Sequence, residues 1–274
     1  MNYFDAAIFG IVEGLTEFLP ISSTGHLMLT AKLLGGQTEF LKTFEIVIQL
    51  GAILSVIVLY WQKFLLDFAV LKRVIAAFIP TAVIGFLFYK IVKNVLMESD
   101  AVVLWALAIG GIAIIAFELV LSRKMRRKDS VLIKNENGGV IANNVGIEKI
   151  SYQKALLIGV FQAIAIIPGV SRAAATIIGG LALGIKRRVI VEFSFLLAVP
   201  TMLAASCLDL YKNASLFSFN QFNFLAIGFI VSFLTAMLAI KFFLKFIKRH
   251  TFIGFGIYRI LIVLVFVLIF SVLP

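Results

Sequence analysis

The chain has little of what a water-soluble protein depends on. Only 14% of its 274 residues are charged, whereas 62% are hydrophobic. Soluble domains carry about a quarter charged residues, so this chain could not cover a globule with polar surface. Its single cysteine, Cys207, excludes an intramolecular disulfide. The first residues lack a basic segment and a small-residue cleavage site, so we expect no removable signal peptide.

The charges that are present are mostly basic, and the net charge is +11 at pH 7. In a soluble protein this excess would suggest a nucleic-acid partner. Here Lys and Arg flank apolar stretches, as they do on the cytoplasmic side of membrane proteins. We therefore expect a bilayer partner, no nucleic acid, and a single integral membrane domain over residues 1–274.

Six apolar stretches are each long enough to cross a bilayer core, which needs about 20 apolar residues. Charged or polar residues bound each stretch. The sequence thus predicts an all-α polytopic protein with six transmembrane helices, at residues 43–61, 74–92, 101–121, 189–211, 222–244 and 252–273.

Two further apolar segments are interrupted by proline. Residues 4–19 run into Pro20, and residues 155–167 run into Pro168, which lacks the N–H that a helix interior needs. Half-helices of about 12–16 residues span roughly 18–24 Å, well short of a crossing of about 30 Å. Each segment therefore predicts a re-entrant hairpin. Basic clusters lie on both sides of residues 155–185, which places both ends of that segment in the cytoplasm.

The two broken segments suggest an inverted repeat. Gly10-Ile11-Val12-Glu13 is similar to Gly159-Val160-Phe161-Gln162, and each stretch precedes a proline and serine. Three spans follow each broken segment, and an odd number makes the second half enter from the opposite face. We expect halves at residues 1–121 and 155–274, joined by a cytoplasmic linker at 122–154 that is rich in Asn and Gly.

Ionisable residues within the first broken segment are candidates for function, because unpaired charges are costly in hydrocarbon. Glu13 and Glu17 are four residues apart and share a helix face. Their repulsion requires a cation, a shared proton or an arginine nearby. The alternative is that both pair with lysines at the membrane interface.

The polar residues after each proline predict an anion site. Ser22, Ser23 and Thr24 form an N-cap run, and the free N–H groups of a helix start favour phosphate. His26 lies one turn on, where it could activate a serine hydroxyl; simple capping is the alternative. The second break has the same design, with Ser171 as cap, Arg172 as a forked phosphate donor and Thr176 one turn further.

Other polar residues in the spans are weaker candidates. Glu45 and Glu192 could line a cavity or bond between helices. Glu118 is expected to pair with Arg123, and Asp209 and Arg259 are interpreted as structural.

The two polar motifs closely resemble the signatures of a known family, the undecaprenyl-diphosphate phosphatases of the bacitracin-resistance (BacA) type. They are Glu13-Gly14-Leu15-Thr16-Glu17-Phe18-Leu19-Pro20-Ile21-Ser22-Ser23-Thr24-Gly25-His26-Leu27 and Pro168-Gly169-Val170-Ser171-Arg172. The resemblance implies removal of the terminal phosphate from undecaprenyl pyrophosphate, which recycles the lipid carrier for cell-wall synthesis and confers bacitracin resistance. It also implies a divalent cation, Mg²⁺ or Ca²⁺, bound by Glu13 and Glu17.

The resemblance carries the family's functional positions onto this chain. It implies catalytic roles for Glu13, Glu17, Ser23, His26 and Arg172. It implies substrate binding by Ser22, Thr24, Ser171, Arg172 and Thr176. The family usually has Ser-Gly after the arginine, whereas this chain has Ala173 and Ala174, so one hydroxyl and one flexible glycine are missing.

A second family of membrane phosphatases, the PAP2 type, also uses Ser-Gly-His and Ser-Arg stretches. It needs a histidine six residues after the arginine, where this chain has Ile178. His250 lies far along the chain in a basic loop, so the PAP2 interpretation fails.

The sequence-based hypothesis is that Ser23 attacks the terminal phosphorus while His26 takes its proton. Attack by His26 itself or by metal-bound water stays open, and so does a homodimer. The rival function is a polyprenyl-phosphate flippase or secondary transporter, which can use the same inverted repeat. We expect a location in the bacterial cytoplasmic membrane, with the site open to the outer face.

Overall fold

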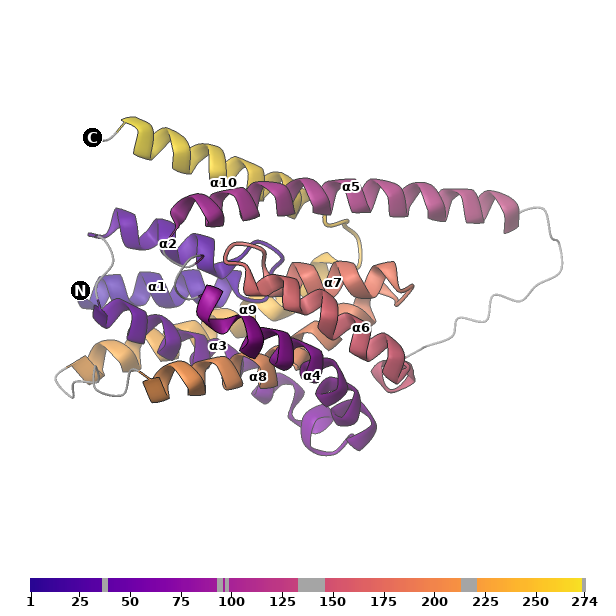
Figure 1. Ribbon diagram of the computed structural model, residues 1–274, viewed down its shortest axis with the longest axis horizontal. Coiled ribbons are helices and arrows are strands. Elements are labelled where there is room, and N and C mark those ends of the chain that lie inside the picture. Colours follow the sequence, from indigo (N-terminus) through magenta and orange to yellow (C-terminus); the bar gives the residue numbers. More distant parts are fainter. Residues whose placement is uncertain (36–38, 93–95, 97–98, 133–145, 213–220, 273–274) are drawn as a thin grey trace.

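The computed structural model describes all residues except 36–38, 93–95, 97–98, 133–145, 213–220 and 273–274 (Figure 1). Over this described part the chain is helical, without β-strands. The helices are α1 (Tyr3–Thr16), α2 (Ser23–Leu33), α3 (Glu39–Leu65), α4 (Phe68–Ile91), α5 (Asp100–Leu132), α6 (Tyr152–Ala163), α7 (Arg172–Ala182), α8 (Arg187–Lys212), α9 (Phe222–Phe246) and α10 (Ile253–Val272). Short 3₁₀ turns occur at η2 (Ile147–Lys149) and η3 (Ile164–Ile166).

Among the residues that the structure describes, five helices are long and apolar enough to cross a membrane, and each coincides with one of the predicted spans. The five segments are Phe40–Phe64, Phe68–Tyr89, Asp100–Arg123, Arg187–Tyr211 and Phe222–Phe246. Large apolar side chains such as Phe86 (79% exposed) and Trp105 (68% exposed) lie on their outer surfaces. Such surface suits lipid tails. The sixth predicted span, in α10, is apolar but shorter over its described side chains, Ile253–Ile269.

Both proline-containing segments form a helix, a break and a second helix that packs against the first. The first hairpin is α1 and α2, and the second is α6, η3 and α7. The turns of the two hairpins meet near the middle of the molecule (Figure 1). At each turn a serine precedes the second helix in the left-handed region, Ser22 with φ 72° and Ser171 with φ 70°. Both breaks lie at the prolines, as the sequence predicts, but α1 ends at Thr16 and α6 at Ala163, three and four residues before the predicted ends at 19 and 167.

Each hairpin is braced by a helix of the other half of the chain. α1 packs against α9, and α6 packs against α4. A Cβ atom on Gly10 would meet the carbonyl oxygen of Gly228, and one on Gly159 would overlap that of Ala77, so glycine permits both close approaches. Further helices of the two halves also pack together, among them α3 with α9 and α8, α4 with α8, and α5 with α10 and α7.

The segment between the halves is partly helical, because α5 continues past residue 121 to Leu132. The asparagines and glycines of the predicted linker, at 135–144, lie outside the described residues. The expected pair of Glu118 with Arg123 is wrong. Glu118 is buried, and it instead binds Arg187 at 2.8 Å and accepts from the backbone N–H of Phe252 at 3.2 Å. A buried carboxylate requires partners that reach into the core, and Arg187 at the start of α8 does.

Candidate active site

Glu17 joins the two hairpin turns. The hydroxyl of Ser23 donates to Glu17 Oε2 at 2.6 Å, and Arg172 Nη2 lies 3.3 Å from Glu17 Oε1. The side chains of Glu17 and Arg172 are almost buried. A carboxylate, a hydroxyl and a guanidinium from segments 155 residues apart thus form one connected group.

The guanidinium of Arg172 is held by a carbonyl oxygen and by an aromatic ring, and one of its N–H donors is left without an acceptor in the described structure. Its Nη1 donates to the carbonyl oxygen of Ser194 at 2.8 Å, and its centre lies 5.8 Å from the ring centroid of Phe18. Its buried Nε has no hydrogen-bond partner among the residues that the structure describes. A buried N–H without an acceptor costs free energy, so a phosphate oxygen that reached it would be favoured.

Glu13 lies deeper, and only 1% of its surface is exposed. Within the described ranges its Oε1 has no hydrogen-bond partner. Glu17, Glu45 and Arg172 are close enough to act on Glu13 electrostatically. An orphaned carboxylate oxygen beside further carboxylates fits a hard divalent cation such as Mg²⁺ or Ca²⁺.

The described side chains contain no group of three or more His, Cys, Asp and Glu residues positioned to hold a metal ion. Mg²⁺ commonly takes one or two carboxylates and completes its shell with substrate phosphates and water. Glu13 and Glu17 fit that kind of partial site.

His26 does not form the expected pair with a serine hydroxyl in the described structure. Its Nδ1 lies 2.8 Å from the carbonyl oxygen of Ser22, and its Nε2 lies 2.8 Å from the hydroxyl of Tyr258 on α10. Spacing of four residues brings the imidazole to the backbone of Ser22 rather than to its side chain. The hydroxyl of Ser23 turns toward the end of α1 and Glu17, which is its closest acceptor.

The other candidate residues differ in their burial and in the hydrogen bonds that they make at the hairpin turns. Ser171 caps α7 by accepting from the N–H of Ala174 at 3.3 Å, whereas Ser22 makes no side-chain cap bond to the described start of α2. Thr24 is exposed. Thr176 is fully buried, and its hydroxyl bonds to Gln162 at 3.1 Å and to the carbonyl oxygen of Arg172 at 2.9 Å. Thr176 therefore braces the second hairpin from within.

Arg259, which the sequence suggests is structural, links both turns to α5. It is fully buried, and its guanidinium donates to five backbone carbonyl oxygens. The acceptors belong to Pro20, Gly169, Val170, Ala106 and Leu107, at 2.8–3.5 Å. An arginine inside an apolar helix is the sequence signal for such a role, because its charge needs compensation. Its targets could not be read from the sequence.

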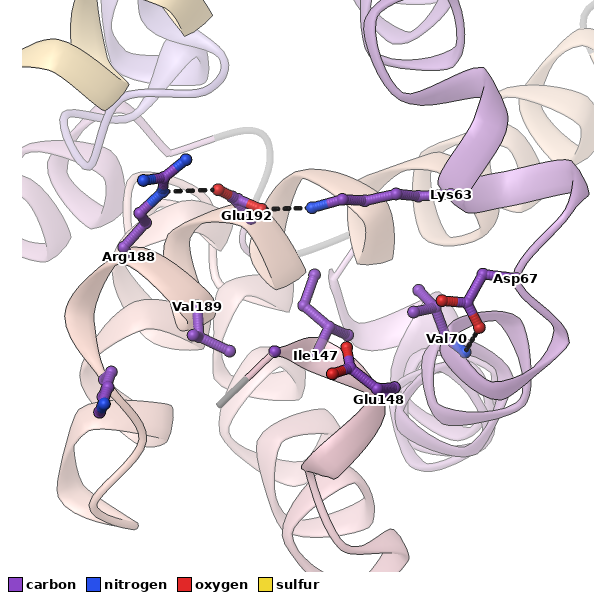
Figure 2. A pocket seen from close by; sticks show the side chains of 10 residues that line it. Lys63, Asp67, Val70, Ile147, Glu148, Arg188, Val189 and Glu192 are labelled. Atoms are coloured by element: carbon purple, nitrogen blue, oxygen red, sulfur yellow. Dashed lines mark hydrogen bonds and ion pairs between the residues drawn. The ribbon is translucent and has the colours of Figure 1, made fainter. Parts of the chain in front are cut away.

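A separate cavity of about 360 Å³ lies where α3 ends and α8 begins (Figure 2). Glu192 bridges Lys63 at 2.6 Å and Arg188 at 3.0 Å, so it bonds between helices. The lining includes three basic residues (Lys63, Lys186, Arg188) and three acidic ones (Asp67, Glu148, Glu192). This balanced charge gives no preference for a pyrophosphate, and the described lining includes none of the candidate catalytic residues.

Comparison with known proteins gives a consistent result over nearly the whole chain. The family described as "Bacitracin resistance protein BacA" matches residues 6–265. The undecaprenyl-diphosphatase of Aquifex aeolicus is 48% identical over 271 residues, which cover 98% of this chain and 99% of that one. The protein of the same name from Sulfurihydrogenibium sp. is 49% identical over 263 residues, or 96% and 97% of the two chains.

Proposed function

Because the chain belongs to the bacitracin resistance protein BacA family, we propose that it removes the terminal phosphate from undecaprenyl diphosphate. The products are the lipid monophosphate, which is reused as a carrier in cell-wall synthesis, and inorganic phosphate. This recycling would confer resistance to bacitracin. The observation that carries the proposal is Glu17, which contacts both Ser23 and Arg172 where the two hairpins meet.

The pyrophosphate would bind between the two hairpin turns. α2 and α7 both begin there, and the free N–H groups and positive dipole end of a helix start favour anions. Arg172 adds a charged donor, and its Nε lacks an acceptor among the described residues. These groups would also stabilise charge that develops during phosphoryl transfer.

In the proposed reaction, Ser23 Oγ attacks the terminal phosphorus. The bond from that phosphorus to the bridging oxygen breaks, and the lipid monophosphate leaves. The Ser23 proton passes to Glu17, which already accepts it at 2.6 Å. Water then attacks the phosphorus of the phosphoserine, the bond from phosphorus to Ser23 Oγ breaks, and phosphate leaves. Ser23 Oγ regains its proton from Glu17. His26 is the alternative base, and that route requires Ser23 to leave Glu17 and His26 to leave Tyr258.

Glu13 and Glu17 would hold a divalent cation, Mg²⁺ or Ca²⁺. The cation would neutralise negative charge on the pyrophosphate oxygens and offset the repulsion between the two carboxylates.

We also propose that α10 is a sixth span and that the hairpins are re-entrant parts of an inverted repeat. The matching φ angles of Ser22 and Ser171 support this arrangement. So do matching bonds, since Thr235 on α9 donates to the carbonyl of Gly10 and Thr81 on α4 donates to that of Gly159. Basic loops would lie in the cytoplasm of a bacterial cell, with the site open to the outer face of the inner membrane.

The function is tested by phosphate release from undecaprenyl diphosphate by detergent-purified protein, with and without EDTA. We expect metal-dependent release by the wild type and a loss of roughly 10²-fold or more in Arg172→Ala. Arg188→Ala is the matched control, because Arg188 is on the exposed side of the Glu192 bridge. In detergent there is no membrane with two sides to transport between, so a protein that is only a transporter would release no phosphate.

Two results would contradict the proposal. A well-folded wild type that releases no phosphate with any divalent metal would favour the lipid transporter. Full activity in Arg172→Ala would remove this arginine from the site.

A further inference from the structure

Tyr258 on α10 touches the active site from the far end of the chain. Its hydroxyl lies 2.8 Å from His26 Nε2, although the two residues are 232 positions apart. The two rings also stack, with centroids 5.5 Å apart and an interplanar angle of 7°. Tyr258 therefore restricts the imidazole by a hydrogen bond and by ring contact at once.

The contacts of His26 determine where its proton lies. The carbonyl oxygen of Ser22 can only accept, so Nδ1 at 2.8 Å from it must carry hydrogen. In the neutral imidazole Nε2 is then the bare nitrogen, and it accepts from the Tyr258 hydroxyl. If the ring becomes protonated, Nε2 donates instead, and the same hydroxyl can accept. Tyr258 is thus a suitable partner for both states of His26.

The position of Tyr258 is itself fixed by its neighbour. Arg259 is fully buried and binds carbonyl oxygens of both hairpin turns and of α5, which holds this part of α10 against the site. Tyr258 is the next residue on the helix and is 43% exposed. Its hydroxyl therefore contacts His26 while part of its ring stays accessible from outside.

We propose that Tyr258 is a positioning residue of the active site, which holds the His26 imidazole in one orientation and as the tautomer with hydrogen on Nδ1. The kinetic part of this inference rests on the proposed phosphatase function, and the structural part does not. Replacement by phenylalanine keeps the stacked ring and removes only the hydroxyl, so the fold should be retained.

The direct test uses nitrogen NMR of the full chain in detergent micelles with ¹⁵N-labelled histidine. The chain has two histidines, and His250→Gln removes the exposed second one, so the remaining imidazole signals belong to His26. We expect one protonated and one hydrogen-bonded bare nitrogen. In Tyr258→Phe the bare nitrogen should shift toward the position of a free acceptor. Tyr152→Phe, on the exposed surface of α6, is the control and should leave both signals unchanged.

The kinetic test uses the same variants without the His250 substitution. The Tyr258 contact bears on kcat only where His26 acts as the base, because Glu17 takes the proton in the other route. There, Tyr258→Phe frees Nε2 and should raise kcat by roughly 2- to 10-fold, as for the loss of one neutral hydrogen bond, with little change in KM. Unchanged His26 signals in Tyr258→Phe would overturn the proposal, and an unchanged kcat would overturn its role in the reaction. A nitrogen shift together with a wild type that releases no phosphate would support the placement of Tyr258 and reject the phosphatase.

Discussion

The carboxylate of Glu13 and the amide of Gln162 occupy matching places in the two hairpins but have different surroundings. Both side chains are buried. Gln162 donates to Thr81 and Thr201 and accepts from Thr176, so its amide is fully engaged. Glu13 Oε1 has no hydrogen-bond partner in the described part of the chain. One hairpin thus uses this place for bracing, and the other keeps a buried carboxylate that is poorly satisfied.

This contrast predicts that Glu13→Gln stabilises the protein and inactivates it. Removing a poorly satisfied buried carboxylate should raise the free energy of unfolding by about 1 kcal/mol, which corresponds to a rise of roughly 2–4 °C in Tm. Phosphate release should fall. Added Mg²⁺ or Ca²⁺ should raise the Tm of the wild type but not that of Glu13→Gln. The reverse change, Gln162→Glu, is the matched control and should lower Tm. A Glu13→Gln protein that still gains stability from the metal would exclude Glu13 as its ligand.

Local patterns in the sequence predict residues whose roles depend on their immediate neighbours. The Ser171 cap follows from such a pattern, since it needs only the next few residues and the chemistry of helix starts. The contact of His26 with Tyr258 spans 232 residues, and spacing carries no information about it. The partner of Ser23 also could not be predicted, because spacing alone lets its hydroxyl reach either His26 or Glu17. The packing of α2 against α1 within the hairpin brings this hydroxyl to Glu17.

At the scale of elements, two small residues let the hairpins approach the opposite half. Gly159 on α6 faces the backbone of α4 at Ala77, and Thr81 reaches across to the carbonyl of Gly159 at 2.8 Å. The other hairpin repeats this with Gly10 and Thr235 against α9, at 3.3 Å. Close helix packing through small residues is the usual means of association where lipid tails supply no hydrophobic drive.

Gly159→Ala should therefore destabilise the protein, because its methyl group would overlap the carbonyl oxygen of Ala77. Overpacking of this kind costs about 1–3 kcal/mol, and a fall in Tm of roughly 2–12 °C should follow. Gly254→Ala on α10 is the control, since its added Cβ meets no described atom within 4 Å. Alanine favours helix there, so Tm should stay level or rise slightly. Equal Tm values for the two variants would mean that α6 and α4 do not pack this closely.

Helix ends were predicted well where proline acts and poorly where only hydropathy changes. Pro20 and Pro168 mark both hairpin turns, because proline acts on the backbone itself. The apolar run predicts a span that ends at residue 121, yet the helix α5 continues to Leu132. Arg, Lys and Met are good helix formers, so a helix can leave the apolar region without ending.

At the scale of the whole molecule, chain direction and charge agree on one orientation. α1 begins and α10 ends at the left end of Figure 1, whereas α5 ends at the right end. Lys63, Lys186 and Arg188 gather around the cavity between the end of α3 and the start of α8. By the positive-inside rule, that end is the one we propose to face the cytoplasm.

This orientation can be tested with introduced cysteines, because Cys207→Ala leaves a chain without any other thiol. Phe4 and Tyr211, at 72% and 83% exposed, lie on the proposed outer side, so Phe4→Cys and Tyr211→Cys should react with a membrane-impermeant maleimide in intact cells. Lys154→Cys and Lys186→Cys should react only after the cells are opened. The pair Lys154→Cys and Lys186→Cys is decisive, because these two residues flank the second hairpin. If one is labelled from outside and the other is not, the hairpin crosses the membrane and the repeat is not built as proposed.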